Sequence, residues 1–283
     1  MPDDIRVAIL GCGPAGMFAA HAVQEAGHEF TMLSKNRKSY MRGAQYLHRP
    51  IPGLSGSPFP VQYALKGTVE GYRDKVYGDM GDILVSPETL VGVSDAWDIR
   101  EAYDRAWELY SDRIVDVELR GAGPTFLEEL TREFDMVIST VPNPVLCRNP
   151  SEHQFLSQKV WVTDKLRTLG EFEFGTDGTM MDNLVVCSGD KNDWWYRQSR
   201  IHGWENTEFP HSRRPAKPWV GADGKPPYTV HEVEKPIRHT CTCFPEIVRM
   251  GRYGKWQKGV LSHESFYNTA RALVAIEQGW VTA

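Results

Sequence analysis

The segment from Val7 to Lys35 constrains the fold of this chain more than any other stretch of its sequence. It begins with an apolar run typical of a buried strand, which leads directly into the glycine-rich turn Gly11-Cys12-Gly13-Pro14-Ala15-Gly16. A helical pattern follows, ends at Gly27 and leads into a second apolar strand at residues 30–33. This order of strand, turn, helix and strand is the context that a dinucleotide-binding fingerprint requires. The segment therefore predicts a Rossmann-like βαβ unit.

Each glycine of the turn has its own expected role. Gly11 permits the tight turn, Gly13 lets the backbone approach a pyrophosphate, and Gly16 lets the helix pack closely on the strand. The N-terminus of the helix offers free N–H groups and the positive end of its dipole to the phosphates. We therefore expect Gly11, Gly13, Pro14, Ala15 and Gly16 to bind a nucleotide. The alternative is a βαβ unit with a purely structural role.

The end of the second strand lacks the acidic residue that usually binds the adenosine ribose in such units. Ser34 and Lys35 stand there instead, and the cationic segment Asn36-Arg37-Lys38 follows. This departure argues against a plain NAD-binding site. The cations could hold a 2′-phosphate or the adenine-side phosphate of FAD, or they form a solvated basic turn.

A second group of candidate cofactor contacts follows the second strand. Arg42, Gly43, Ala44 and Gln45 lie within a run of otherwise bulky residues. A glycine in such a run indicates that the backbone closely approaches another group. In a flavoprotein the chain would pass the pyrophosphate and ribityl groups here. The alternative is a long surface loop.

The composition is that of an ordinary globular protein, with 41% apolar residues, 24% charged residues and a net charge of −5. A negative net charge argues against extended binding to nucleic acid or to a membrane surface. The N-terminus leaves no room for a signal peptide, and no apolar run approaches the ~20 residues of a membrane span. The five cysteines do not form a disulfide framework. We therefore expect a cytoplasmic protein with a small-molecule substrate and no membrane or nucleic-acid partner; a homo-oligomer is an open alternative.

The rest of the chain has further periodic patterns. Apolar residues recur at helical spacing over residues 98–111, and Thr125 and Glu128 have the spacing of a capping box that opens a helix. Gly121-Ala122-Gly123-Pro124 imitates a second nucleotide turn, but Phe126 stands where the fingerprint needs glycine, so we interpret it as a connector. The expected strands are residues 61–66, 114–119, 134–141, 158–162, 171–174, 183–187 and 228–233, and a last helix is expected over residues 259–278.

Three segments carry a resemblance to known families. The form Gly-x-Gly-Pro-Ala-Gly at residues 11–16 resembles that of FAD-dependent oxidoreductases of the glutathione-reductase fold. Residues 134–142 resemble the Asp-x-Val-Ile-x-Thr-x-Pro strand of the amine-oxidase-like branch of that superfamily. Gly251-Arg252-Tyr253-Gly254-Lys255-Trp256 is similar to a segment of bacterial UDP-galactopyranose mutases that precedes their last flavin-contacting helix. The middle of the chain has no counterpart in this likeness.

The resemblance implies FAD lying extended across the crevice of the nucleotide domain. The diphosphate would lie at the first turn, and the end of the strand at Val141 would lie near the cofactor. Gly251, Arg252 and the segment Gly259, Val260 and Leu261 would lie beside the ribityl group and the isoalloxazine. Two departures stand out: Ser34-Lys35 replaces the usual acid, and Val260-Leu261 replaces the Asp-Met of the mutases.

His239, Cys241 and Cys243 alternate along the chain, so their side chains could face the same side of an extended segment. Thiolates and imidazole suit zinc or iron. No fourth ligand is evident nearby, and ordinary strand residues are the preferred interpretation. The sequence therefore assigns no metal.

Other residues are candidates for contact with a substrate. Trp195, Tyr196, Arg197 and Arg200 combine aromatic rings and cations, which can stack on a planar substrate or bind a carboxylate or phosphate. They are equally able to pack a small antiparallel layer on a sheet. His48 and His263 are candidate proton-transfer groups, because a neutral imidazole can act as an acid or a base.

The sequence thus predicts an α/β fold, a Rossmann-like FAD-binding domain of the glutathione-reductase type with an interleaved, mostly antiparallel covering domain. Residues 1–60, 113–142 and 236–283 would form the FAD-binding domain, and residues 61–112 and 143–235 the covering region. The expected function is that of an FAD-dependent oxidoreductase acting on a small substrate such as an amine or amino acid. The alternatives are a flavin-dependent sugar-nucleotide mutase and a non-catalytic nucleotide-binding protein.

Overall fold

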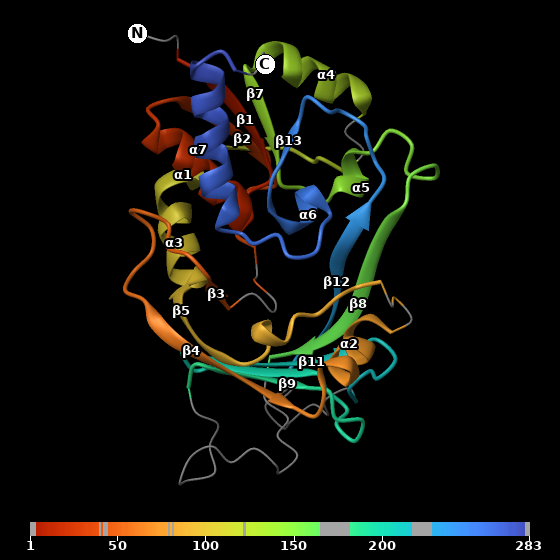
Figure 1. Cartoon of the computed structure of the whole chain (residues 1–283). Coiled ribbons are helices and arrows are strands. Elements are labelled where there is room, and N and C mark those ends of the chain that lie inside the picture. Colours follow the sequence, from red (N-terminus) through yellow and green to blue (C-terminus); the bar gives the residue numbers. More distant parts are fainter. Residues whose placement is uncertain are drawn as a thin grey trace, which may run out of the picture.

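The structure is a computed structural model of the whole chain, and it describes residues 4–39, 41, 45–78, 80, 82–120, 123–164, 182–216 and 228–280. Two sheets organise the molecule, as Figure 1 shows. A parallel sheet lies with its helices in one half, and a larger, curved sheet lies beneath it in the other half. The chain passes between the two halves several times, so neither half is continuous in sequence.

The parallel sheet is built around β1 (Arg6–Leu10), which lies at its centre. On one side of β1 follow β2 (Glu29–Ser34) and β6 (Ile114–Asp116), and on the other β7 (Met136–Ser139) and β13 (Val248–Arg249). Every pairing in this sheet is parallel. The carboxyl ends of the five strands therefore meet at one edge, where the glycine-rich turn leaves β1.

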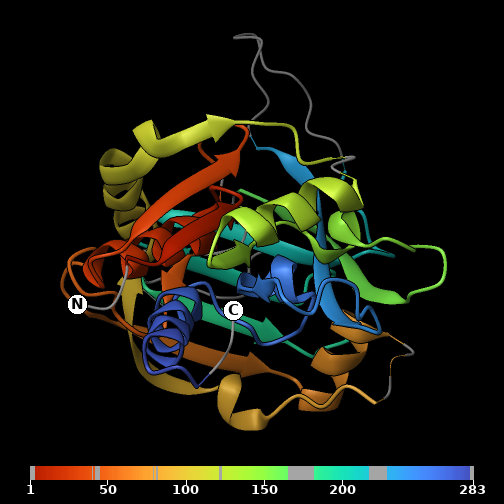
Figure 2. The ribbon, with the colours of Figure 1, turned by 90° about the horizontal axis from the view of Figure 1, so that it is seen from above.

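Helices cover both faces of the parallel sheet because side chains of β1 alternate between two cores. Val7 and Ile9 pack with α1 (Pro14–Glu25), α3 (Ile99–Tyr110) and α7 (Glu264–Glu277). Ala8 and Leu10 pack on the opposite face with α4 (Pro124–Glu133) and α5 (Asn143–Leu146). Figure 2 shows this layering from above. A strand buried on both faces is the usual consequence of a parallel sheet with crossover helices.

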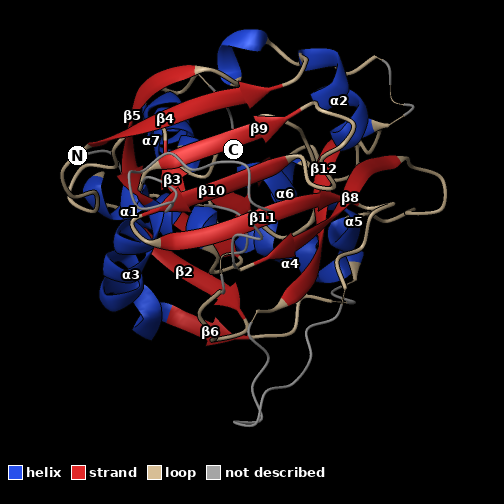
Figure 3. Ribbon diagram, turned by 90° about the horizontal axis from the view of Figure 1, so that it is seen from below, coloured by secondary structure: helices blue, strands red, loops and turns tan. Residues whose placement is uncertain are grey.

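The second sheet has the strand order β12-β8-β11-β10-β9-β4-β5-β3 and fills the view of Figure 3. Its pairs are antiparallel except for β4 with β9. Shorter elements are α2 (Val69–Tyr77), α6 (Gly251–Lys255) and two 3-10 turns at Pro87–Thr89 and Ser111–Arg113. The strands of this sheet are β3 (Tyr46–Leu47), β4 (Phe59–Lys66), β5 (Gly92–Asp98), β8 (Phe155–Thr163), β9 (Leu184–Ser188), β10 (Arg197–Ile201), β11 (Trp204–Pro210) and β12 (Val230–His239).

The mixed α/β architecture confirms the expected class, a parallel sheet together with a largely antiparallel one. Two details differ from the sequence-based expectations. The capping box at Thr125 is wrong, because α4 begins at Pro124 after Gly123 and no side chain caps it. The last helix begins at Glu264, five residues later than expected. The expected strand at residues 171–174 lies outside the described residues.

Two segments near the expected domain boundaries pack as follows. The buried face of helix α3, within residues 61–112, packs on α1. Strand β12 continues to His239 and pairs with β8. The expected division of the chain into an FAD-binding domain and a covering region stays a prediction. Among the residues that the structure describes, no helix is both long and apolar enough to cross a membrane.

Candidate functional site

The glycine-rich turn joins β1 to α1 at the carboxyl edge of the parallel sheet. Gly11 has a φ of +99°, a conformation that side chains strongly disfavour. A Cβ atom on Gly16 would lie 1.9 Å from the carbonyl oxygen of Gly11, so only glycine allows the helix to pack this close. Among the described residues, a Cβ atom on Gly13 would meet only Ser39 Oγ, at 3.6 Å. The protein itself therefore does not require glycine at residue 13, whereas a ligand approaching the backbone would.

Helix α1 presents its N-terminus at this turn without a side-chain cap. Gly13 is the N-cap residue, no side chain bonds to the first N–H groups, and Pro14 takes the first helical position. The N–H groups of a first helical turn have no partner within the helix, and they attract anions. The local geometry thus fits the diphosphate of a dinucleotide.

Side chains from elsewhere in the chain hold the turn in place. The hydroxyl of Tyr103 on α3 donates to the carbonyl oxygen of Cys12 at 2.9 Å and accepts from the N–H of Ser39 at 2.9 Å. Thr140, which follows β7, donates through its hydroxyl to the carbonyl oxygen of Leu10 at 2.9 Å. Val141 comes next in the chain and is half-buried beside the turn, within the core that contains Leu10. The turn is therefore fixed from both of its sides.

The cations expected at the end of β2 have an acidic neighbour. Ser34 pairs in register with Asp116 on β6, and Lys35 Nζ lies 3.7 Å from the carboxylate of Asp116. Both side chains of this ion pair are about half-exposed. The acid that the fingerprint normally carries on the second strand is thus present at the same edge, on the next strand of the sheet. The sequence offered no signal for this placement, because Asp116 lies about 80 residues after Lys35 in the chain.

The segment after β13 returns directly to the glycine-rich turn. A Cβ atom on Gly251 would lie 2.6 Å from Cβ of Ala15, and one on Gly254 would lie 2.5 Å from the carbonyl oxygen of Ser139. The short helix α6 is therefore packed against the start of α1 and the end of β7. This contact supports the expectation, drawn from resemblance alone, that residues 251–256 lie near a bound nucleotide.

Arg252 projects from α6 toward the second sheet. Its Nη2 atom donates to the carbonyl oxygen of Pro236 on β12 at 3.3 Å, and its Nε atom is buried without a partner among the described residues. Burial lowers the pKa of Arg252 from its ordinary value. A buried donor with no acceptor is costly, so an anionic or oxygen-bearing ligand would complete this group.

The segment Gly259, Val260 and Leu261 precedes α7. Gly259 is exposed, with no atom within 4 Å of a Cβ placed on it, and Val260 and Leu261 are half-buried. The N–H of Leu261 donates to the carboxylate of Glu264 at 3.1 Å. That N–H group is therefore already satisfied within the chain.

The structure brings His48 and His263 together, although they lie far apart in sequence. Their ring centroids are 6.4 Å apart, with His48 just after β3 and His263 at the N-cap of α7. Burial, together with the charge of His48, lowers the pKa of His263 to about 4, and burial also lowers the pKa of His48. Within the part of the chain that the structure describes, the Nδ1 atom of His263 is buried and has no hydrogen-bond partner. Both imidazoles are therefore neutral near pH 7 and can accept a proton.

Gln45 lies just before β3 and bonds to two other strands of the second sheet. Its side-chain oxygen accepts from Ser199 Oγ on β10 at 2.5 Å, and its Nε2 atom donates to the carbonyl oxygen of Trp204 at 3.4 Å. Arg42, Gly43 and Ala44 lie outside the described residues.

The four expected substrate contacts do not share one face of the second sheet. Trp195 packs with Leu184 and Phe209 in a small cluster on one face, and Arg200 pairs in register with Leu184. Tyr196 and Arg197 instead bind Glu208 through the Tyr196 hydroxyl and the Arg197 guanidinium. Arg197 and Arg200 lie three residues apart in β10 and therefore on opposite faces, because residues of a strand alternate between faces. Trp195 and Tyr196 precede β10 and pack in two separate clusters.

Glu208 is the centre of a charged group that the sequence did not indicate. It is fully buried and binds Arg197, Lys235 and the Tyr196 hydroxyl, and Lys235 Nζ donates to Tyr196 Oη at 2.9 Å. Burial alone would raise the pKa of Glu208, but the cations Arg197 and Lys235 lower it to about 2. Burial lowers the pKa of Lys235 to about 8. Lys235 lies next to Pro236 on β12, and the carbonyl oxygen of Pro236 accepts from Arg252 of α6, so the group lies near α6.

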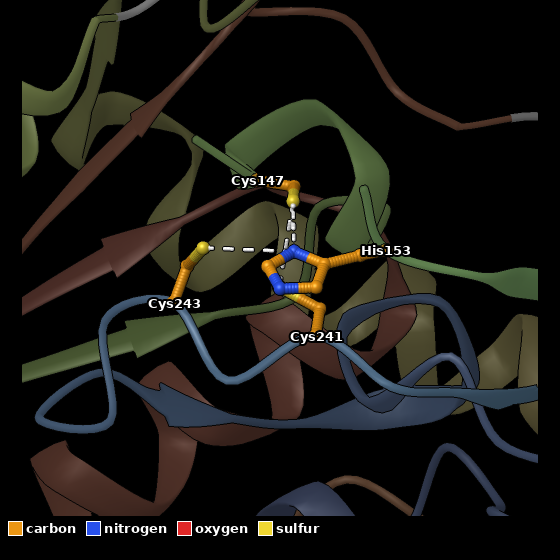
Figure 4. A group of neighbouring side chains, drawn as sticks. All are labelled: Cys147, His153, Cys241 and Cys243. Carbon is orange, nitrogen blue, oxygen red and sulfur yellow. Dashed lines mark hydrogen bonds between the residues drawn. The ribbon is translucent and has the colours of Figure 1, made fainter. Parts of the chain in front are cut away.

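Cys241 and Cys243 do converge with other potential ligands, but His239 is not among them. The ring of His239 stacks on Phe155 at 6.0 Å. The two cysteines gather instead with Cys147 and His153, as Figure 4 shows.

Comparison with known proteins places this geometry in a recognisable fold. No protein-family model matches the chain, and no curated protein matches its sequence. A reduced UDP-galactopyranose mutase matches in structure with a TM-score of 0.54 at 11% identity, over 99% of this chain and 96% of the mutase. The p-nitrophenol 4-monooxygenase PnpA of Pseudomonas putida DLL-E4 matches with a TM-score of 0.54 at 12% identity, over 99% of this chain and 82% of the enzyme.

A third match names its cofactor class. Tar14, the tryptophan C-6 flavin-dependent halogenase of taromycin biosynthesis, matches with a TM-score of 0.51 at 10% identity, over 99% of this chain and 73% of the halogenase. Identities this low establish a shared fold. The chain therefore has the fold of these enzymes, and both of its sheets lie within the matched region.

Proposed function

We propose that this chain binds FAD with the diphosphate at the Gly11–Gly16 turn. The observation that carries the proposal is the contrast within that turn. Gly16 is required by the packing of the chain itself, whereas Gly13 leaves its backbone open at the uncapped N-terminus of α1. The fold shared with a flavin-dependent halogenase supports FAD over other dinucleotides. The glutathione-reductase type of FAD-binding domain belongs to this proposal, and its support is the form of the turn.

The remaining cofactor contacts follow from the segments that converge on the turn. Lys35 would face the adenine-side phosphate, with Asp116 beside it for the ribose. Ala15, Val141 and Gly251 line the approach to the start of α1. Arg252 would reach the flavin end, because its buried Nε atom lacks a protein partner on the side of the second sheet.

The proposed activity is that of an FAD-dependent oxidoreductase acting on a small substrate. Bound FAD supplies the capacity to accept two electrons from an organic molecule. Arg252 would stabilise negative charge, and the neutral pair His48 and His263 would accept a proton from the substrate. An amine or amino acid suits this pair, because its ammonium group must lose a proton before it is oxidised. Among the expected substrate contacts, Tyr196 and Arg197 belong to the buried group around Glu208 near α6, so we place the substrate there.

The cofactor assignment is tested on the purified protein. Denaturation followed by chromatography of the released nucleotide should yield FAD, or the apoprotein should bind added FAD. Recovery of NAD(P) alone, with no binding of FAD, would contradict the proposal.

The reaction class is tested separately. Amines and amino acids are added anaerobically, and a substrate should bleach the flavin, whose colour an electron acceptor should restore. Turnover without any acceptor and without net consumption of reductant would favour a mutase over an oxidoreductase.

A further inference from the structure

We propose that Cys147, His153, Cys241 and Cys243 form a structural zinc site that joins the α5–β8 connection to the β12–β13 connection. Each residue offers one ligand atom, and these four atoms all lie within 4.8 Å of one another. Figure 4 shows the sulfur atoms gathered around the imidazole of His153. The site is independent of the proposed flavin chemistry.

The spacing of the four atoms fits a single tetrahedral ion. Zinc bound to sulfur at about 2.3 Å and to nitrogen at about 2.0–2.1 Å separates two sulfurs by about 3.8 Å and a sulfur and a nitrogen by about 3.6 Å. The Sγ atoms of Cys147 and Cys241 are 3.5 Å apart. His153 Nδ1 lies 3.1 Å from Sγ of Cys147 and 3.9 Å from Sγ of Cys243. The two sulfur–nitrogen distances thus lie on either side of the expected value, and the sulfur–sulfur distance is slightly shorter than expected.

Hydrogen bonding among the side chains does not account for this convergence. A single imidazole nitrogen carries either one proton or one lone pair, so Nδ1 of His153 can form one good hydrogen bond. Two thiols approach it, and a third lies against one of them. A disulfide between Cys147 and Cys241 would use two of the sulfurs and leave Cys243 and His153 without a role.

The surrounding backbone holds the two connections in place around the cluster. Gln154 and Thr240 bond to each other, with Gln154 N donating to Thr240 Oγ1 at 2.9 Å and Thr240 N donating to the Gln154 carbonyl oxygen at 3.1 Å. Arg249 donates to the carbonyl oxygen of Cys243 at 2.5 Å and to Asn143 Oδ1 at 3.1 Å. Such outer contacts orient metal ligands and are a regular feature of metal sites.

The ligand set indicates zinc and a structural role. Three thiolates and one imidazole are a common set for structural zinc, and four protein ligands leave no position for a substrate. Cys241 is buried, while Cys147, His153 and Cys243 are half-buried, so an ion could enter from solvent. The β12–β13 connection leads through β13 into Gly251 and Arg252, so the metal would fix the segment that returns to the Gly11–Gly16 turn.

The first test measures metal in the full-length protein purified under reducing conditions from zinc-supplemented cells. We expect about one zinc per chain, released when an organomercurial blocks the thiols. Replacing zinc with Co²⁺ should give thiolate-to-cobalt charge-transfer bands and the visible bands of a tetrahedral site. Reduced protein that binds neither Zn²⁺ nor Co²⁺ stoichiometrically would overturn the proposal, as would a Cys147–Cys241 disulfide found in the purified protein.

Matched variants locate the site. His153→Gln and Cys243→Ala should lose stoichiometric zinc and melt at a lower temperature. His239→Gln, only two residues from Cys241, and Cys187→Ala, a buried cysteine on β9, should keep one zinc. Full zinc content in both His153→Gln and Cys243→Ala, or loss of zinc in His239→Gln, would overturn the assignment.

Discussion

Gly13 and Gly16 lie three residues apart in one turn but need glycine for different reasons. A Cβ atom on Gly13 would meet only Ser39 Oγ at 3.6 Å, and the φ of Gly13 is an ordinary −69°. A Cβ atom on Gly16 would collide with the Gly11 carbonyl oxygen at 1.9 Å. We therefore expect Gly13→Val to fold normally and lose FAD, whereas Gly16→Val should destabilise the apoprotein itself.

Thermal melting of the two apoproteins, followed by titration with FAD, separates these effects. Gly16→Val should melt well below the wild type, and Gly13→Val close to it. Normal FAD occupancy in Gly13→Val would show that the diphosphate does not lie at this turn.

Arg252 has a buried Nε atom for which the protein provides no acceptor. If the flavin supplies that acceptor, Arg252→Ala removes one charge-assisted contact, which is worth about 1.5–3 kcal/mol. FAD should then bind about ten- to a hundred-fold more weakly, or become harder to reduce. Arg238→Ala is the matched control, since Arg238 lies on β12 near Pro236 but is exposed and pairs with Asp82. Equal FAD affinities and reduction potentials for the two variants would place Arg252 outside the site.

The strands of the second sheet are tied together by a buried ion group. Glu208 on β11 is fully buried between Arg197 on β10 and Lys235 on β12. Removing one member of such a group leaves uncompensated buried charge, which typically costs about 3–5 kcal/mol. Glu208→Gln should therefore unfold at a much lower denaturant concentration than the wild type. Glu232→Gln, at the exposed pair with Lys159 on the same sheet, should shift it little.

The same group makes a prediction about pH. Because Arg197 and Lys235 outweigh the effect of burial and lower the pKa of Glu208 to about 2, its ordinary value of 4.5 applies only in the unfolded chain. The unfolded chain thus binds the extra proton first, and the stability from Glu208 is complete above pH 4.5 and lost as the pH falls to 2. The difference in free energy of unfolding between wild type and Glu208→Gln should therefore decrease as the pH falls through this range. If the two proteins differ by the same free energy of unfolding throughout this pH range, Glu208 is not stabilised by Arg197 and Lys235 as described.

The sequence predicted best the helices and strands whose apolar residues recur with a regular helical or strand periodicity. β1 and α3 came within one residue of their observed bounds, because their burial follows a simple strand or helix pattern. Strands β10 and β11 were missed. Their buried positions include the polar residues Ser199, Asn206 and Glu208. Ser199 bonds to Gln45, and Glu208 binds Arg197 and Lys235, so the partners that accommodate these two residues come from distant parts of the chain. Hydrophobic periodicity gives no signal for such strands.

At the scale of the whole molecule, the sequence indicated the nucleotide turn but not what surrounds it. The turn could be predicted because its whole glycine pattern lies within six consecutive residues. The pairing of His48 with His263, of Lys35 with Asp116, and of Cys241 with Cys147 depends on crossings between distant segments. His239, Cys241 and Cys243, which the sequence allowed on one side of an extended segment without assigning a metal, do not converge, because β12 ends at His239.

The proposed FAD site draws on segments from the whole length of the chain, so occupancy should stabilise the whole fold. The turn at residues 11–16, Thr140 after β7 and Gly251 after β13 meet at one edge of the parallel sheet. A ligand that binds only the folded state adds about 2.7 kcal/mol at a hundred-fold excess over its Kd. For a chain of this size each kcal/mol raises the melting temperature by about 2–4 °C, so FAD should raise it by roughly 5–10 °C. Calorimetry of the apoprotein with increasing FAD measures this shift, and Gly13→Val provides the control in which the shift should vanish. A rise of equal size in Gly13→Val would mean that FAD binds elsewhere on the molecule.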